Sequence, residues 1–253
     1  VQLFAGAWIA RYPARAAHLL LIVALILAFD TATKHCAVVL ARDGAIVAQR
    51  ASDEERFSHA EKLNVFIEEV LIEAALTMKD VEAVGVGIGP GSYTGLRIGL
   101  SAAKGLCFAL DVPLLALPTL DVLGAELLAT GMAVNDTDAL HPMIDARRME
   151  VFTGVLDAYG HPLGHTTPVI LDDAWRNDLS TGQKHIVFGD GADKAAALWE
   201  QWIHITHVAG VRPSVRGLAA RSLKAFQRKE YAELARLVPQ YGKEANVTRP
   251  GAK

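Results

Sequence analysis

Gly89-Pro90-Gly91-Ser92-Tyr93-Thr94-Gly95-Leu96-Arg97-Ile98-Gly99 is the stretch of this chain that says most about its fold. An apolar, strand-like segment at 81–88 precedes it, and a helical pattern that reaches about residue 110 follows it. Glycine and proline give the stretch a tight turn, and the free N–H groups at a helix start attract anions. Its spacing fits neither a Walker loop nor the dinucleotide fingerprint. A phosphate cradle and a plain tight turn therefore stand as equal alternatives.

The residues before this turn predict the rest of a first α/β unit. Apolar runs at 25–29, 36–41 and 45–50 are typical of strands, and Asp43-Gly44 between the last two is a hairpin signal. Apolar positions three and four residues apart from 63 to 75 predict an amphipathic helix. The order of hairpin, helix, strand and helix favours a mixed sheet with helices on its faces.

A second and smaller unit follows from about residue 120. Its predicted elements are a hairpin around Ala146-Arg147-Arg148, two short strands and a final helix, over 141–145, 149–156, 185–188, 204–208 and 216–237. These elements again combine strands with a helix, so the chain as a whole is predicted to be an α/β protein.

Length, composition and charge fit this reading and exclude some functions. The chain has 253 residues, about half of them apolar, with a net charge of −3, which suits one large or two small domains. No stretch carries the basic cluster that grips a phosphate backbone, so we do not expect the chain to hold a nucleic acid alone. Cys36 and Cys107 lie in apolar segments and predict buried thiols and a reducing cytoplasm.

The two ends of the chain are expected to lie outside the fold. Arg11 and Arg15 precede an apolar run at 19–29, which imitates a signal peptide. That run is too short to span a bilayer, and its second half is needed as the first core strand. We therefore interpret residues 1–24 as an upstream extension and residues 239–253, rich in breakers, as a flexible tail.

The glycine stretch also carries a resemblance to a known family. Together with Ile26 to Thr33, His59 to Leu63, Ala103 to Leu106 and Ile144 to Val151, it resembles the TsaB (YeaZ) family. These are bacterial subunits of the machinery that attaches a threonylcarbamoyl group to an adenosine beside the tRNA anticodon. The resemblance covers residues 25 to 160 well and the remainder weakly.

The resemblance implies a fold and a function. The fold is that of two tandem ribonuclease-H-like modules of the actin, sugar kinase and heat-shock chaperone superfamily, here at 25–119 and 120–238, the second with a last helix that packs back. The function is that of a non-catalytic dimerisation subunit for a TsaD-type transferase, with a TsaE-type small ATPase and a homodimer as further partners. Contact with tRNA is then expected only through the complex, in the cytoplasm and without a membrane. The alternative is a free-standing metal- or ATP-dependent hydrolase or kinase.

Two sets of turn residues are candidates for weakened phosphate loops. In the superfamily an acidic residue at the end of the first strand helps to hold a metal–phosphate group, and here that position is Asp30. The candidates are Asp30, Thr31, Gly89, Gly91, Ser92 and Thr94 in the first module, and Gly189 and Gly191 in the second. The competing interpretation is that Asp30 only caps its own turn and that the glycines only make turns. No cofactor is expected to be required, and ATP stays open.

No catalytic or metal-binding residue is assigned from the sequence. The sister family TsaD carries two histidines after a strand like 112–117, and the matching positions here are Thr119 and Leu123. His161 and His165 have a spacing that suits a metal only on a helix, and the glycines and proline around them predict a loop. Arg147 and Arg148 lie in a turn without an assigned role.

Small residues along the second helix suggest close packing against another helix. Glycine inside a helix costs about 1 kcal/mol relative to alanine, so several of them need a reason. The resemblance favours pairing with another subunit, because family members pair through their first two helices. The predicted interface consists of Phe66, Val70, Gly95, Gly99, Ala102 and Ala103. Packing of this face against the chain's own sheet is the alternative.

Overall fold

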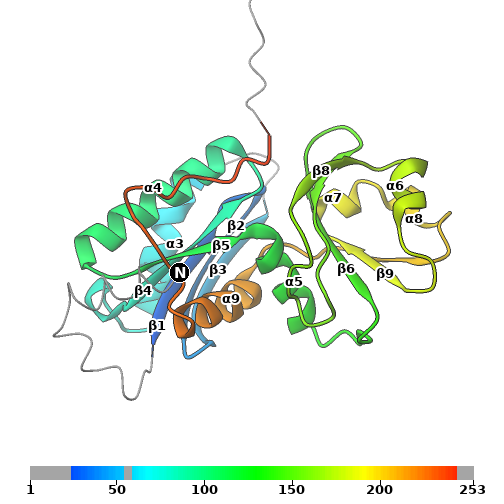
Figure 1. Cartoon of the computed structure of the whole chain (residues 1–253). Coiled ribbons are helices and arrows are strands. Elements are labelled where there is room, and N and C mark those ends of the chain that lie inside the picture. Colours follow the sequence, from blue (N-terminus) through cyan, green and yellow to red (C-terminus); the bar gives the residue numbers. More distant parts are fainter. Residues whose placement is uncertain (1–23, 54–58, 244–253) are drawn as a thin grey trace, which may run out of the picture.

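The structure is a computed structural model, and it describes residues 24–53 and 59–243. Two α/β lobes lie side by side (Figure 1). The strands of the first are β1 Leu25–Asp30, β2 His35–Arg42, β3 Ala45–Asp53, β4 Ala83–Gly89, β5 Leu114–Pro118 and β11 Tyr231–Ala232. Its helices are α3 His59–Glu73, the 3-10 turn Met78–Asp80, α4 Tyr93–Leu110 and α9 Val215–Gln227. The helix α5, Thr119–Ala129, leads into the second lobe.

The first sheet has the strand order β11-β5-β4-β1-β2-β3. β2 is antiparallel to β1 and β3, whereas β4 runs parallel to β1 and to β5. Alternate residues of β1 face opposite layers: Leu25, Leu27 and Phe29 pack with α3 and α4, while Ile26 and Ala28 pack with α9. A strand that is buried on both faces explains the unbroken apolar run in the sequence.

The second lobe repeats this topology on a smaller scale. Its elements are β6 Ala139–Asp145, β7 Glu150–Thr153, β8 Thr167–Ile170, α6 Asp173–Asp178, β9 His185–Phe188, α7 Asp190–Asp193, α8 Ala196–Trp199 and β10 Ile205–Val208. The sheet order is β10-β9-β6-β7-β8. β7 is antiparallel to β6 and β8, and β9 is parallel to β6 and β10. In both lobes, therefore, a three-stranded meander continues into two parallel strands, which confirms the predicted pair of mixed sheets.

The carboxyl-terminal part of the chain returns to the first lobe. α9 packs on α5 and on the sheet of β1, β2 and β5. The predicted final helix at 216–237 was too long, because α9 ends at Gln227 and Lys229 takes a left-handed backbone with φ of 56°. β11 then pairs with β5.

Both predicted chain ends need correction at their borders. Ala24 was assigned to the upstream extension, but it is buried and its N–H donates to Asp43 Oδ1 at 2.9 Å. Residues 239–243 were assigned to a flexible tail, but Gln240 N donates to Ile88 O at 2.7 Å. Residues 1–23 and 244–253 lie outside the described part of the chain.

Candidate phosphate loops and helix interface

Asp30 lies at the end of β1 and is completely buried. Its Oδ1 accepts a hydrogen bond from Ala32 N at 2.7 Å, and its Oδ2 lies 3.4 Å from Thr119 Oγ1. The side chain therefore caps its own turn, as one of the two sequence interpretations expected. Burial raises the pKa of Asp30 to about 7, although the bond from Ala32 opposes that rise. Both oxygens of the Asp30 carboxyl group therefore lie within hydrogen-bonding distance of groups of the chain itself.

The glycine loop after β4 is packed against this turn. Ser92 N donates to Ala32 O at 2.6 Å, and a Cβ at Gly91 would lie 2.3 Å from the same oxygen. Gly89 N donates to Thr119 Oγ1 at 3.1 Å. Ser92 also begins α4 as its N-cap, because its hydroxyl accepts from Gly95 N at 3.3 Å. The loop thus directs these three N–H groups to oxygens of the chain itself.

The second module has the same two features at equivalent positions. Asp145 ends β6 and accepts from Arg147 N at 2.8 Å, as Asp30 does from Ala32. Gly189 follows β9 with φ of 106°, and Gly89 ends β4 with φ of 109°. A Cβ at Gly189 would lie 2.2 Å from Met143 O, so this glycine is needed for close packing of two backbones.

Between the two loops lies a segment that the sequence analysis did not anticipate. Tyr241 stacks on Tyr93 with ring centroids 4.4 Å apart, and its hydroxyl accepts from Arg97 Nε at 2.9 Å. Two residues on, Lys243 pairs with Glu150 of the second module. The segment at 240–243, the red end of the ribbon in Figure 1, therefore bridges the two modules beside both candidate loops. Nothing in its composition distinguishes it from an ordinary polar tail.

The two positions that match the sister family's histidines lie in the interior of the fold. Thr119 and Leu123 are both completely buried, and Thr119 Oγ1 contacts Gly89 and Asp30. His161 lies in a loop and its Nδ1 is 3.1 Å from Asp157 Oδ2. Within the described ranges, no group of three or more His, Cys, Asp or Glu side chains is arranged to hold a metal ion.

The predicted interface divides between the interior and the surface. Val70, Gly95, Gly99 and Ala103 are buried within the chain, so they do not form an exposed face. A Cβ at Gly99 would lie 2.4 Å from Thr31 Oγ1, which shows packing against the chain's own sheet. Phe66 and Ala102 are only partly buried. For the four buried residues, the alternative interpretation of internal packing describes the structure.

The sequence analysis missed large apolar side chains on the outer surface of α3 and α4. Val65, Ile72 and Phe108 are 49%, 70% and 86% exposed. Val65 and Ile72 are seven residues apart and share one helix face. Gly105, three residues before Phe108, has no atom within 4 Å of a built Cβ. The residues Val65, Ile72, Ala102, Gly105 and Phe108 are called the α3–α4 face below.

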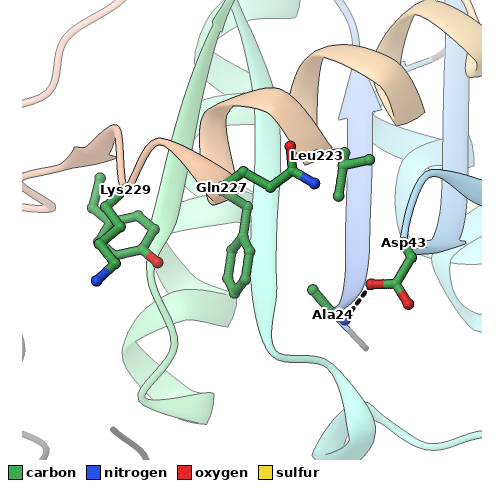
Figure 2. A pocket seen from close by; sticks show the side chains of 7 residues that line it. Ala24, Asp43, Leu223, Gln227 and Lys229 are labelled. Atoms are coloured by element: carbon green, nitrogen blue, oxygen red, sulfur yellow. Dashed lines mark hydrogen bonds between the residues drawn. The ribbon is translucent and has the colours of Figure 1, made fainter. Parts of the chain in front are cut away.

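A small hollow of about 120 Å³ lies elsewhere, between the start of β1 and the end of α9 (Figure 2). Its lining includes Ala24, Asp43, Leu223, Gln227 and Lys229. Because the candidate loops follow the opposite ends of β1 and β4, this hollow is separate from them. None of the helices within the described residues is long and apolar enough to cross a membrane.

Fold and loops together define a protein of two tandem ribonuclease-H-like modules whose equivalent turns are held by their own hydrogen bonds. The model of the family described as "TsaD: tRNA N6-adenosine threonylcarbamoyltransferase" matches residues 36–244. The chain is 30% identical over 226 residues to the tRNA threonylcarbamoyladenosine biosynthesis protein TsaB of Bacillus subtilis, covering 85% of this chain and 93% of that one. The chain therefore belongs to the TsaB (YeaZ) family.

Two further comparisons agree. An uncharacterised protein of Mycobacterium tuberculosis is 36% identical over 132 residues, which are 51% of this chain. The match spans 58% of that relative's length. A crystal structure of a Pseudomonas aeruginosa protein with similarity to the peptidase YeaZ superposes with a TM-score of 0.71 and 25% identity, covering 87% of this chain and all of that one.

Proposed function

We propose that this chain acts in the biosynthesis of tRNA N6-threonylcarbamoyladenosine, as the subunit that binds and supports a TsaD-type transferase. The name of the Bacillus subtilis relative, which aligns over nearly its whole length, supports the pathway. The proposed role is non-catalytic, because the candidate phosphate loops are tied to the chain itself. The chain then needs no cofactor of its own. Calorimetry with Mg-ATP tests the remaining alternative of a free-standing kinase or hydrolase.

The observation that carries the partner role is the α3–α4 face. Ile72 and Phe108 expose most of their apolar surface on two helices that pack against each other, and large exposed apolar groups can mark interaction sites. The occupant we propose is a TsaD-type chain. This chain itself matches the TsaD family model over residues 36–244, so the partner is expected to present the equivalent helix pair. Two such pairs can pack face to face as a helix bundle.

The experiment measures partner affinity and stability on the same variants. Ile72→Asp and Phe108→Asp place a charge in the proposed contact and are expected to weaken binding to the TsaD-type chain tenfold or more, which is about 1.4 kcal/mol. Both side chains are exposed, so the melting temperature of the free chain should change little. Ile203→Asp is the matched control, since Ile203 is 95% exposed in the second module.

Unchanged affinity in both face variants would contradict the proposed interface. An equal loss of affinity for the transferase in the Ile203→Asp control would instead indicate a general effect of the added charge. The same two face variants also test the homodimer, because a second copy of this chain and the transferase would compete for the α3–α4 face. The proposal that a TsaE-type ATPase is a further partner rests on the resemblance alone. Reconstitution of tRNA modification with and without that ATPase tests it. In this proposal the complex acts in the cytoplasm and the chain meets tRNA as part of it.

A further inference from the structure

The turn between β6 and β7 has an unusual backbone. Arg147 and Arg148 are consecutive and exposed. Both have a left-handed backbone conformation, with φ of 73° and 51°. Left-handed backbone is unfavourable for a residue with a Cβ, and glycine or asparagine usually occupies it. The turn is held by Arg147 N donating to Asp145 Oδ1 at 2.8 Å and by Ala146 N donating to Glu150 O at 3.0 Å. The chain thus carries two arginines where smaller residues would fit better.

The carboxylates beside this turn already have partners. Lys194 Nζ pairs with Asp145 and also donates to Glu150 O at 2.6 Å. Lys243, from the carboxyl-terminal segment, pairs with Glu150 and lies 5.8 Å from the ring of Phe152. A third carboxylate, that of Asp190, accepts from Asp145 N at 3.0 Å on the inner side of the turn, and burial raises its pKa.

The arginines are therefore left without a neutralising group. Among the described residues, neither the Arg147 nor the Arg148 guanidinium has a hydrogen-bond or ion-pair partner. Four cations from three separate parts of the sequence meet at one turn, although no stretch of the sequence is itself basic. Guanidinium groups bind phosphate oxygens in a two-point geometry, and successive phosphates of a nucleic acid can occupy successive arginines.

We propose that the β6–β7 turn is a phosphate-contact site for RNA, in which Arg147 and Arg148 each engage one backbone phosphate and Lys194 and Lys243 neutralise the neighbouring carboxylates. The inference rests on the proposed function, since it gives this chain a direct contact with the tRNA held by the complex. The sequence analysis expected contact with tRNA only through the complex, and the proposal places one direct contact of that complex on this turn. The contact is independent of base sequence, because it involves only phosphate charge.

The test uses the full chain in complex with its TsaD-type partner and an unmodified tRNA transcript. Binding is measured between 0.05 and 0.5 M salt for wild type and for R147A/R148A. Each lost phosphate contact lowers the slope of log K against log salt by about 0.7 to 0.9, so the double variant should lower it by about 1.5 and weaken binding about 20-fold or more at 0.1 M salt. R216A/R228A, which removes the exposed Arg216 of α9 and the exposed Arg228 that follows this helix, is the matched control.

Two further variants separate charge from turn geometry. R147K/R148K keeps the charges and should retain most of the salt slope. R147G/R148G should lose binding as R147A/R148A does, yet melt at a higher temperature than R147A/R148A, because glycine accepts the left-handed backbone.

An unchanged slope and affinity in R147A/R148A would overturn the proposal. Weaker binding to the transferase with unchanged binding of tRNA would overturn it too, and would show that the arginines face an acidic protein surface. Failure of the wild-type chain to bind the transferase at all would instead count against the proposed function. Measurement of tRNA binding by the free chain and its R147A/R148A variant would then test the phosphate contact at the β6–β7 turn separately.

Discussion

The hydroxyl of Thr31 donates a hydrogen bond to the carbonyl oxygen of Gly95 at 2.8 Å, and both residues are buried. This bond joins the turn after β1 to the first turn of α4. The same hydroxyl lies where a side chain at Gly99 would have to go. The absence of a side chain at Gly99 is therefore explained by contact with the turn after the chain's own first strand, without a second subunit.

Substitution of alanine for glycine should change the free energy of unfolding in opposite directions on the two sides of α4. At Gly99 the added Cβ would lie 2.4 Å from Thr31 Oγ1, so Gly99→Ala should cost about 1–3 kcal/mol of unfolding free energy. At Gly105 no atom lies within 4 Å, so Gly105→Ala should gain up to about 1 kcal/mol from helix propensity. Urea denaturation of both variants measures the difference. Equal effects at the two sites would show that the packing of α4 differs from that described.

The effect of Asp30→Asn on the free energy of unfolding, relative to wild type, should become more favourable as the pH rises. Burial raises the pKa of Asp30 from 3.8 to about 7. The folded state therefore keeps a proton that the unfolded state releases, and wild-type stability falls between those two values. Asparagine keeps the acceptor for Ala32 N and has no proton to lose. Relative to pH 4, the variant should gain at most about 4 kcal/mol over wild type at pH 8. A difference that does not vary with pH would mean that Asp30 is ionised in the fold.

His141 should make the second module sensitive to acid. Its Nε2 lies 3.0 Å from His185 Nδ1, and burial, followed by the charge of His185, lowers the pKa of His141 from 6.5 to about 3. Because only the unfolded state takes up a proton between these values, stability is complete above pH 6.5 and falls as the pH drops. The stability difference between wild type and His141→Gln should shrink by about 2 kcal/mol from pH 7 to pH 5. Thermal unfolding at the two pH values measures it, and a constant difference would contradict the assignment.

The bridge formed by residues 240–243 should stabilise the contact between the modules. The comparison is between a chain that ends at Lys243 and one that ends at Pro239. Loss of the Gln240 bond and the Tyr241 stacking should cost about 2 kcal/mol. Hydrogen exchange should rise in β7, where Lys243 pairs with Glu150. Similar stability and exchange in the two chains would show that the bridge contributes nothing.

Local patterns in the sequence were sufficient for the main strands and helices and for the α/β architecture, but not for β8, for β11 or for the end of α9. The Asp43-Gly44 turn joins β2 to β3, and the glycine stretch follows β4 and opens α4, as predicted. These features depend on neighbouring residues, because alternation, helical spacing and turn residues act over short distances. The same motifs carried the family resemblance, which the comparisons confirmed.

The position of the candidate surfaces was decided only by tertiary structure. A helix with small residues on several sides, such as α4, has no pattern that tells which side meets the sheet, because glycine lacks a side chain to mark it. The predicted interface was therefore placed partly on the buried side, while Phe108 lies on the exposed one. The cluster of Arg147, Lys194 and Lys243 also needed the fold, since contacts between distant residues depend on how the strands and the returning chain pack.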